Sequence, residues 1–189
     1  MRTLRPSSLS RTLALAAPAV SLVATRVDAA FDAFIKFDTI KGESTEKVHR
    51  DWCEGLSFSF GTETPVLIGG GGSEVGKPKA APLILSKRID KASPQLFLKS
   101  VMGQNLPTLT LELSKSGSVE TAPVVFYKIV LTNAFVSKID SSGTAGDNTP
   151  TESIQISYEK ISIIYSTIDA KGTVVQEPEV TWNFAEDKQ

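Results

Sequence analysis

Side chains that commonly carry catalysis or bind metal ions are scarce in this sequence. It contains one histidine, His49, and one cysteine, Cys53. A catalytic nucleophile needs a neighbouring base and a metal site needs several ligands, so few sites can be built from these residues. Both lie in a stretch that predicts a loop leading into a strand, where they would meet only by accident. We therefore interpret Cys53 as a half-buried apolar residue and His49 as a surface residue.

Acidic residues form two close pairs that could in principle serve as general acid and base. Asp38 with Glu43, and Glu177 with Glu179, lie in polar segments that predict exposed loops. Charges in such segments are usually solvated, and no cluster has the spacing of metal ligands. The sequence therefore predicts no catalytic, metal or cofactor-binding site, which favours a binding or assembly protein.

A glycine-rich segment resembles a phosphate-binding loop in spacing only. Gly71 to Gly76-Lys77 has the required separation, but Pro78 stands where Ser or Thr would hold Mg²⁺. No buried strand leads into the segment and no helix follows it to direct amide groups at phosphates. We exclude nucleotide binding and interpret residues 62–82 as a long, irregular loop, which is usually functional or disordered.

Length and charge restrict the protein class. The 189 residues are 41% hydrophobic and 22% charged with a net charge of −1, as in an ordinary globular domain. Without residues 1–30, which hold four Arg and one Asp, 16 basic and 20 acidic residues remain. Such a chain lacks the basic excess that nucleic-acid binding needs. A single cysteine also excludes an intrachain disulfide.

The first 30 residues differ from the rest of the chain. A basic start, an apolar run at 12–24 and Val27-Asp28-Ala29 resemble a secretory signal peptide. The apolar run is too short to span a bilayer, so no membrane span is predicted. The alternative is a true start at Val27, encoded by an alternative initiation codon. Either way, we expect residues 31–189 to form a single domain.

One segment carries a full set of helix signals. Ser93 can cap the first turn, Pro94 suits the first helical position, and Gly103 can end the helix in a left-handed conformation. We therefore predict a short helix at about residues 94–102. Its apolar stripe is expected to dock on a sheet, and comprises Leu96, Phe97, Ser100 and Val101.

Most of the remaining chain predicts strands. Alternating or apolar runs occur at 31–38, 56–60, 83–88, 108–114, 123–131, 134–139, 151–167 and 174–184. In 56–60, Leu56, Phe58 and Phe60 are expected to point inward. The longest run changes phase near Glu159–Lys160, which indicates a β-bulge. The pattern predicts a mainly β fold, an antiparallel barrel or sandwich of two packed sheets with one helix.

Several motifs occur together in the order found in one family. The chain resembles the haemolysin-coregulated protein (Hcp) family of bacterial type VI secretion systems. The matching motifs are Phe34-Ile35-Lys36, Ile40-Lys41-Gly42-Glu43-Ser44, His49, Leu56 to Gly61, Gly69–Gly72 with Gly76-Lys77, Ile89-Asp90-Lys91, Ser93-Pro94, Leu131, Val136-Ser137, Thr151-Glu152 and Trp182-Asn183. The resemblance implies a β-barrel of two sheets with one flanking helix, assembled into hexameric rings. Stacked rings form a tube that a contractile sheath propels and that can carry effector proteins.

The resemblance directs attention to three sets of residues. Phe34 and Tyr127, apolar residues on otherwise mixed strand faces, are expected to be covered by a neighbouring subunit of the ring. Ser57 and Ser59 are expected on the lumen face, where cargo would touch. The loop between stacked rings would include Gly69, Gly70, Gly71, Gly72, Gly76 and Lys77.

The resulting functional hypothesis is a non-catalytic tube subunit of a type VI secretion system. Its expected partners are further copies of itself, the sheath and spike proteins, and effector cargo. It would be made in the bacterial cytoplasm and then secreted by the machine. The alternative is an exported Hcp-like binding or assembly protein working outside such a machine, which a genuine signal peptide, and with it a periplasmic location, would favour.

Overall fold

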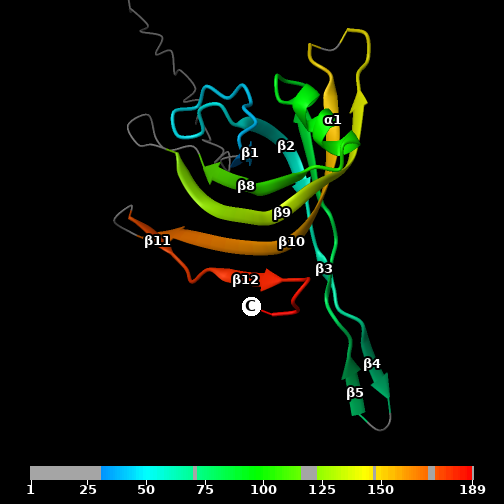
Figure 1. Cartoon of the computed structure of the whole chain (residues 1–189). Helices are drawn as coiled ribbons and strands as arrows, with labels where there is room; N and C mark the ends of the chain where they lie inside the picture. The colour runs from blue at the N-terminus through cyan, green and yellow to red at the C-terminus, as the bar shows by residue number, and fades with distance from the viewer. Residues whose placement is uncertain (1–30, 70–71, 116–122, 147, 170–172, 189) are drawn as a thin grey trace, which may run out of the picture.

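A computed structural model describes residues 31–69, 72–115, 123–146, 148–169 and 173–188 (Figure 1). The predicted N-terminal extension, residues 1–30, lies outside this part of the chain. The described residues form a strongly curved β structure with a single short helix at one end and a long, narrow arm at the other (Figure 1).

Six antiparallel strands close into a barrel. The hydrogen-bonded order is β10, β7, β2, β1, β8 and β9, and pairing of β9 with β10 closes the circle. The predicted antiparallel β-barrel is therefore confirmed. The bounds of these strands are β1 Phe31–Phe37, β2 Cys53–Ser59, β7 Leu83–Arg88, β8 Asn105–Lys115, β9 Val124–Ser142 and β10 Thr151–Ile168.

Alternation along the strands fills the barrel with apolar side chains. In β1, Ala33, Ile35 and Phe37 are at most 6% exposed, as the period of two predicts. In β2 the alternation holds only after a register shift between Gly55 and Ser57, so Phe58 packs against the core while Leu56 is exposed. The inward position predicted for Leu56 is wrong because the shift reverses its direction.

Beyond the barrel, short strands extend the sheet beside β10 and form the arm. β11 (Val174–Gln176) and β12 (Val180–Asn183) both pair with β10, replacing the single strand predicted for 174–184. The arm is a hairpin, so the irregular loop predicted for 62–82 is wrong. Its strands are β3 Thr62–Glu63, β4 Val66–Gly69, β5 Gly72–Val75 and β6 Lys79–Ala80.

A kink crosses three adjacent strands at one level. The buried face changes phase between Leu106 and Leu109 in β8, between Leu131 and Ala134 in β9, and between Ile156 and Ile161 in β10. The phase change near Glu159–Lys160 was predicted, but the bulge was not correctly placed: pairing with β9 continues in register there, and the shift lies at Gln155/Ile156. β9 is also one strand rather than the two predicted.

Asn133 stabilises this kink. Its φ is 51°, in the left-handed region that asparagine tolerates better than most residues. Its side-chain amide donates to Glu159 Oε2 at 2.7 Å, and its Oδ1 accepts a hydrogen bond from Asn105 Nδ2 at 3.1 Å. Residues of β8, β9 and β10 are thereby joined where all three strands turn.

The helix α1 (Ser93–Val101) confirms the predicted position and its predicted end. Gly103 has a φ of 60°, and the Gln104 and Gly103 amides donate to the carbonyls of Lys99 and Ser100. The predicted Ser93 cap is wrong. Ser93 already lies inside the helix, and its hydroxyl instead accepts the Asp90 amide and donates to Glu152.

Candidate assembly surfaces

The residues first considered for catalysis are not brought together. Cys53 is 0% exposed inside the barrel, and burial raises the pKa of its thiol, which keeps it protonated and unreactive. His49 lies on the outer side of the barrel wall, where its ring stacks on Phe34. The two side chains therefore face opposite sides of the sheet and cannot act as a nucleophile and base.

His49 is the centre of a buried ionic cluster. The surface position predicted for it is wrong, because the side chain is 1% exposed. Nδ1 lies 2.7 Å from Glu46 Oε2, and Nε2 lies 2.9 Å from Glu112 Oε2. An ionised carboxylate can only accept a hydrogen bond, so its bond to the ring needs an N–H on the facing ring nitrogen. Lys128 Nζ lies 2.9 Å from the other oxygen of Glu112.

The loop between β1 and β2 positions His49 over the sheet. Gly42 donates to the Asp51 carbonyl at 2.7 Å, and Ser44 donates to that of Trp52 at 2.9 Å. A Cβ on Gly42 would lie 2.3 Å from the Trp52 oxygen, so only glycine permits this approach. The His49 ring is held between Phe34, at 4.1 Å centroid separation, and the edge of Trp52, at 5.0 Å.

A second buried ionic cluster joins the helix to the barrel. Lys87 in β7 is fully buried, and its Nζ lies 2.6 Å from Asp90 Oδ1 and 2.8 Å from Glu152 Oε1. The Ser93 hydroxyl of α1 donates to Glu152 of β10 and so connects the helix to the barrel. Burial acts to lower the pKa of Lys87, but its hydrogen bonds to Asp90 and Glu152 outweigh this and raise it. These hydrogen bonds therefore favour the charged form of Lys87, and the cluster fixes α1 on the sheet.

The predicted pairs of acids play no common role in this structure. Glu43 is exposed and accepts the Lys91 amide, while Glu177 and Glu179 are exposed in the segment between β11 and β12. Within the described residues, no group of three or more His, Cys, Asp or Glu side chains is placed to hold a metal ion.

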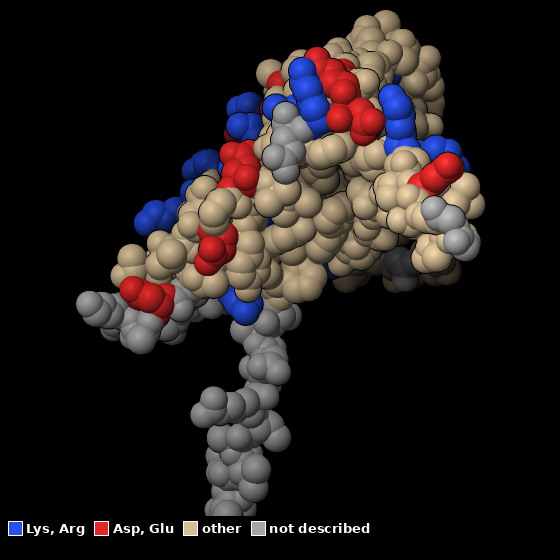
Figure 2. Space-filling model, turned by 90° about the horizontal axis from the view of Figure 1, so that it is seen from below, with Lys and Arg blue, Asp and Glu red and all other residues tan. Residues whose placement is uncertain are grey.

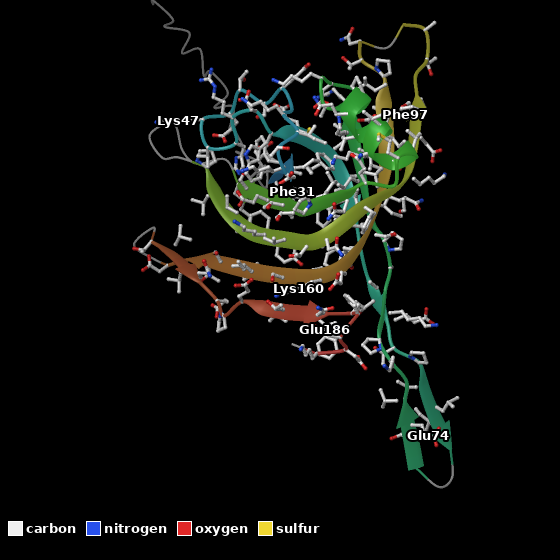
Figure 3. All side chains as sticks on the ribbon, viewed as in Figure 1. Phe31, Lys47, Glu74, Phe97, Lys160 and Glu186 are labelled. Carbon is white, nitrogen blue, oxygen red and sulfur yellow. The ribbon has the colours of Figure 1, made fainter. Side chains whose placement is uncertain are left out.

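The arm carries exposed apolar side chains far from the barrel. Ladder pairs run from Val66↔Val75 to Gly69↔Gly72, and Gly76 donates to Pro65 at 2.8 Å. Gly72 has a φ of 142°, which suits glycine at the turn. Figure 3 shows Glu74 near the outer end of this hairpin. Val66, Leu67, Ile68 and Val75 are 52%, 70%, 89% and 68% exposed.

The residues predicted to contact a stacked ring follow this arm. Gly69 and Gly72 form the closing pair of the hairpin, and Gly76 lies against Pro65. Lys77 is highly exposed, with its Nζ 3.9 Å from Asp187 Oδ2. Gly70 and Gly71 lie outside the described residues. The glycines therefore shape the arm, while its contact chemistry resides in apolar neighbours that the sequence analysis did not single out.

An apolar groove lies where the base of the arm meets β10 and β12. It has a cavity volume of about 370 Å³. Seen from below, much of this end of the molecule carries neither acidic nor basic side chains, and charged residues lie mainly toward its borders (Figure 2). The groove is lined by Phe60, Thr62, Thr64, Pro78, Ile161, Ile163, Val180, Trp182 and Phe184.

Ser57 and Ser59 lie on an outward, hydroxyl-rich face of the barrel. Both are exposed, as predicted from the strand alternation. The register places Ser57 beside Ser86 of β7, which in turn lies beside Ser153 of β10. This row of small polar side chains crosses three strands, with the exposed Ile84 beside Ser59 and the charged Asp140 beside Ser153.

The two residues predicted to lie under a neighbouring subunit have different surroundings. Phe34 is 6% exposed because the His49 loop of its own chain covers most of it, and its contact with a neighbouring subunit stays a prediction. Tyr127 is half-buried against the core, and burial raises the pKa of its hydroxyl. The contact of Tyr127 with a neighbouring subunit stays a prediction.

The helix exposes most of its predicted docking stripe. Leu96 is fully buried against the barrel, but Phe97 and Val101 are 57% and 63% exposed, which contradicts the docking expected for them. The reason is that α1 touches the sheet along one narrow line, anchored by the Lys87 cluster. Figure 3 shows Phe97 at the end of the molecule opposite the arm.

Among the described residues, the helix α1 has nine residues, far fewer than a membrane-spanning helix needs.

Comparisons with known proteins agree with this architecture. Residues 34–165 match the family model described as "Type VI secretion system effector, Hcp". The chain is 29% identical over 162 residues to Protein hcp1 of Pseudomonas aeruginosa, covering 85% of this chain and 99% of that protein. A solved type six secretion system protein aligns with a TM-score of 0.76 at 32% identity, covering 84% of this chain and 99% of its own. Hcp1 from Salmonella typhimurium aligns with a TM-score of 0.67 at 25% identity, covering 84% and 98% of the two chains.

Proposed function

The chain belongs to the Hcp family of type VI secretion proteins, and from that premise we propose that it is a structural subunit of the secretion tube. In this proposal, six copies form a ring, rings stack into a tube, and the lumen carries effector proteins. The protein acts without catalysis, in keeping with a family of structural, secreted proteins.

The arm is the observation that carries this proposal. Its backbone is paired along both strands, yet its apolar side chains have no cover from the described part of the chain. Contiguous exposed apolar side chains of this kind mark protein–protein contacts. Because the arm extends well beyond the barrel (Figure 1), it can reach a copy in a neighbouring ring.

The face around Ser57 and Ser59 supports the cargo role. A surface of small hydroxyl groups can contact many different proteins without strong binding to any, which suits a lumen that must release its contents. We expect Ser59→Arg to abolish cargo retention without changing ring size. Retained cargo, measured by co-purification, would contradict this assignment.

Other partners follow from the same role. Proteins of this family are secreted through the type VI machine, and we propose that this chain passes from the cytoplasm to the outside by that route. The contractile sheath would surround the tube and a spike protein would close its tip. Tyr127 remains a proposed contact within the ring.

Shortening the arm tests the proposal. Since the Gly76 amide donates to the Pro65 carbonyl, residues 66–75 can be replaced by Asn-Gly, which closes a tight hairpin. In negative-stain microscopy of the full chain, we expect the shortened variant to form six-membered rings but no tubes, and the wild type and a Glu74→Gln control to form both. Monomers of the wild type at high concentration would refute the tube function, and loss of rings on shortening would refute the role of the arm.

A further inference from the structure

The apolar groove at the base of the arm has side chains that its own chain leaves accessible. Val180 is 60% exposed at its rim, and Trp182 and Phe184 form its wall. Its volume of about 370 Å³ falls in the range of pockets that hold ligands, so it has room for more than one side chain. Only Thr62 and Thr64 contribute hydroxyl groups to the lining, so its occupant must be mainly apolar.

The tip of the arm supplies matching chemistry. Four apolar side chains gather on β4 and β5, and Ile68 is 89% exposed. The tip carries one charged residue, Glu74, so it could enter an apolar groove while keeping that carboxylate in water.

One copy does not bring its own tip and groove together. The hairpin is paired from Thr62↔Ala80 at its base to Gly69↔Gly72 at its tip, which keeps the arm extended. Figures 1 and 3 show the arm leaving the barrel, with the tip beyond β12. The groove lies at the base of the arm and the apolar tip at its far end, so a contact between them requires two copies.

We propose that the groove receives the β4–β5 tip of a second copy of this chain. This inference rests on the proposed tube function and names the surface that accepts the arm. Tip and groove are different surfaces, so a head-to-tail contact leaves one tip and one groove free, and the contact can then continue from copy to copy.

The size of the contact favours a second copy within an assembly over an isolated dimer. A stable interface usually uses about 20–30 residues on each side, well above the ten residues 66–75 of the tip. A single tip in a groove therefore binds weakly. Several such contacts formed together between two rings gain strength through effective concentration.

Mixed single-cysteine variants test the pairing directly. Full-length Ile68→Cys and Val180→Cys chains are combined under mild oxidation, and cross-linked peptides are identified by mass spectrometry. Cys53 is buried, so it should stay silent. We expect a disulfide between positions 68 and 180 of different chains, at least tenfold more abundant than in a control mixture of Ile68→Cys with Val174→Cys. Linkage only between two position-68 thiols, or equal linkage in the control, would overturn the proposal.

A photo-reactive residue identifies the occupant without presuming it. With p-benzoylphenylalanine at position 180, we expect cross-links to peptides from residues 66–75 of another copy. Cross-links to residues 1–30 of the chain, or to a different protein, would overturn the proposal.

The failure of this inference can be separated from failure of the tube function. If the wild type forms rings and tubes and Val180→Glu does so equally well, the groove is not the acceptor and the tube function stands. If Val180→Glu forms rings without tubes while Val174→Glu, on the exposed strand β11, still forms tubes, the groove is supported. If the wild type forms no rings, the tube function fails, and the cross-link between positions 68 and 180 alone decides for or against the groove.

Discussion

The barrel and the arm place their side chains in opposite ways. In the barrel, apolar residues point inward, and the buried charges of Lys87 and Glu112 lie within 3 Å of opposite charges. In the arm, only the backbone is satisfied within the chain, and the apolar side chains face outward. The barrel therefore buries its own apolar side chains, whereas those of the arm are covered by nothing in the described part of the chain.

Substitution in the Lys87 cluster should give the largest loss of stability. Lys87→Met leaves Asp90 and Glu152 close together without their shared cation, and breaking a buried ion pair in this way costs about 3–5 kcal/mol. Urea denaturation at one fixed protein concentration measures the change. Lys91→Met is the matched control, because Lys91 pairs with Asp51 at the surface, where the loss should stay below about 1 kcal/mol.

A double substitution sharpens the same point. Lys87→Met combined with Glu152→Gln removes both a buried cation and a buried anion, so part of the stability should return. A loss equal to the sum of the two single losses would show that the two residues do not interact, and would contradict the cluster as described.

Substitution of His49 should have a smaller but clear effect. Glutamine keeps one donor group, so His49→Gln removes the side-chain hydrogen bond to either Glu46 or Glu112 and also loses the stacking on Phe34. We expect a loss of about 1–3 kcal/mol in the free energy of unfolding. Lys47→Gln, an exposed position in the same loop, serves as control. No difference between the two variants would mean that His49 contributes no more than a surface residue.

Acid should weaken the loop through Glu46. Burial acts to raise the pKa of Glu46, but hydrogen bonds from the His49 amide and ring and the Val48 amide outweigh it and lower the pKa. A carboxyl with a lowered folded-state pKa stabilises the fold above its unfolded-state pKa, and this contribution disappears as the pH falls through the folded-state value. Between about pH 5 and pH 3, wild type should therefore lose more stability than Glu46→Gln. Parallel losses in thermal denaturation scans would contradict this.

The smallest effect on stability should come from the arm. Leu67→Ser and Ile68→Ser remove side chains that are 70% and 89% exposed, so the free energy of unfolding of the unassembled protein should change by no more than about 0.5 kcal/mol. The same variants should form fewer tubes. A large loss of stability without an effect on tube formation would contradict the view that the barrel carries stability and the arm carries assembly.

Local patterns determined much of the fold in advance. The period of two identified β1, β7 and β8 closely, and the Ser93–Gly103 signals located α1. These predictions succeeded because alternation and helix ends are short-range properties. The prediction for residues 56–60 was only partly right, because the direction of Leu56 depends on a register shift against the neighbouring strand.

The candidate surfaces were less accessible to sequence reasoning. His49 and Glu112 are 63 residues apart, and nothing local indicates that the fold brings them to 2.9 Å. The sequence held one signal for this contact: Glu112 is an acid among the alternating leucines of β8. An acid at such a position needs a hydrogen-bonding or ionic partner. Residues 62–82 looked irregular because a glycine-rich, outward-facing hairpin lacks the buried face from which strands are usually identified.

Strand alternation, the single helix and the family resemblance could be inferred from the amino-acid sequence alone, because each rests on residues close in the chain or in a fixed order. Three features followed only from the tertiary structure: which charges are buried together, that the His49 loop covers Phe34, and that the arm presents its apolar side chains outward. The physical reason is that burial and charge pairing are set by distances between segments remote in sequence, which no local pattern of residues specifies.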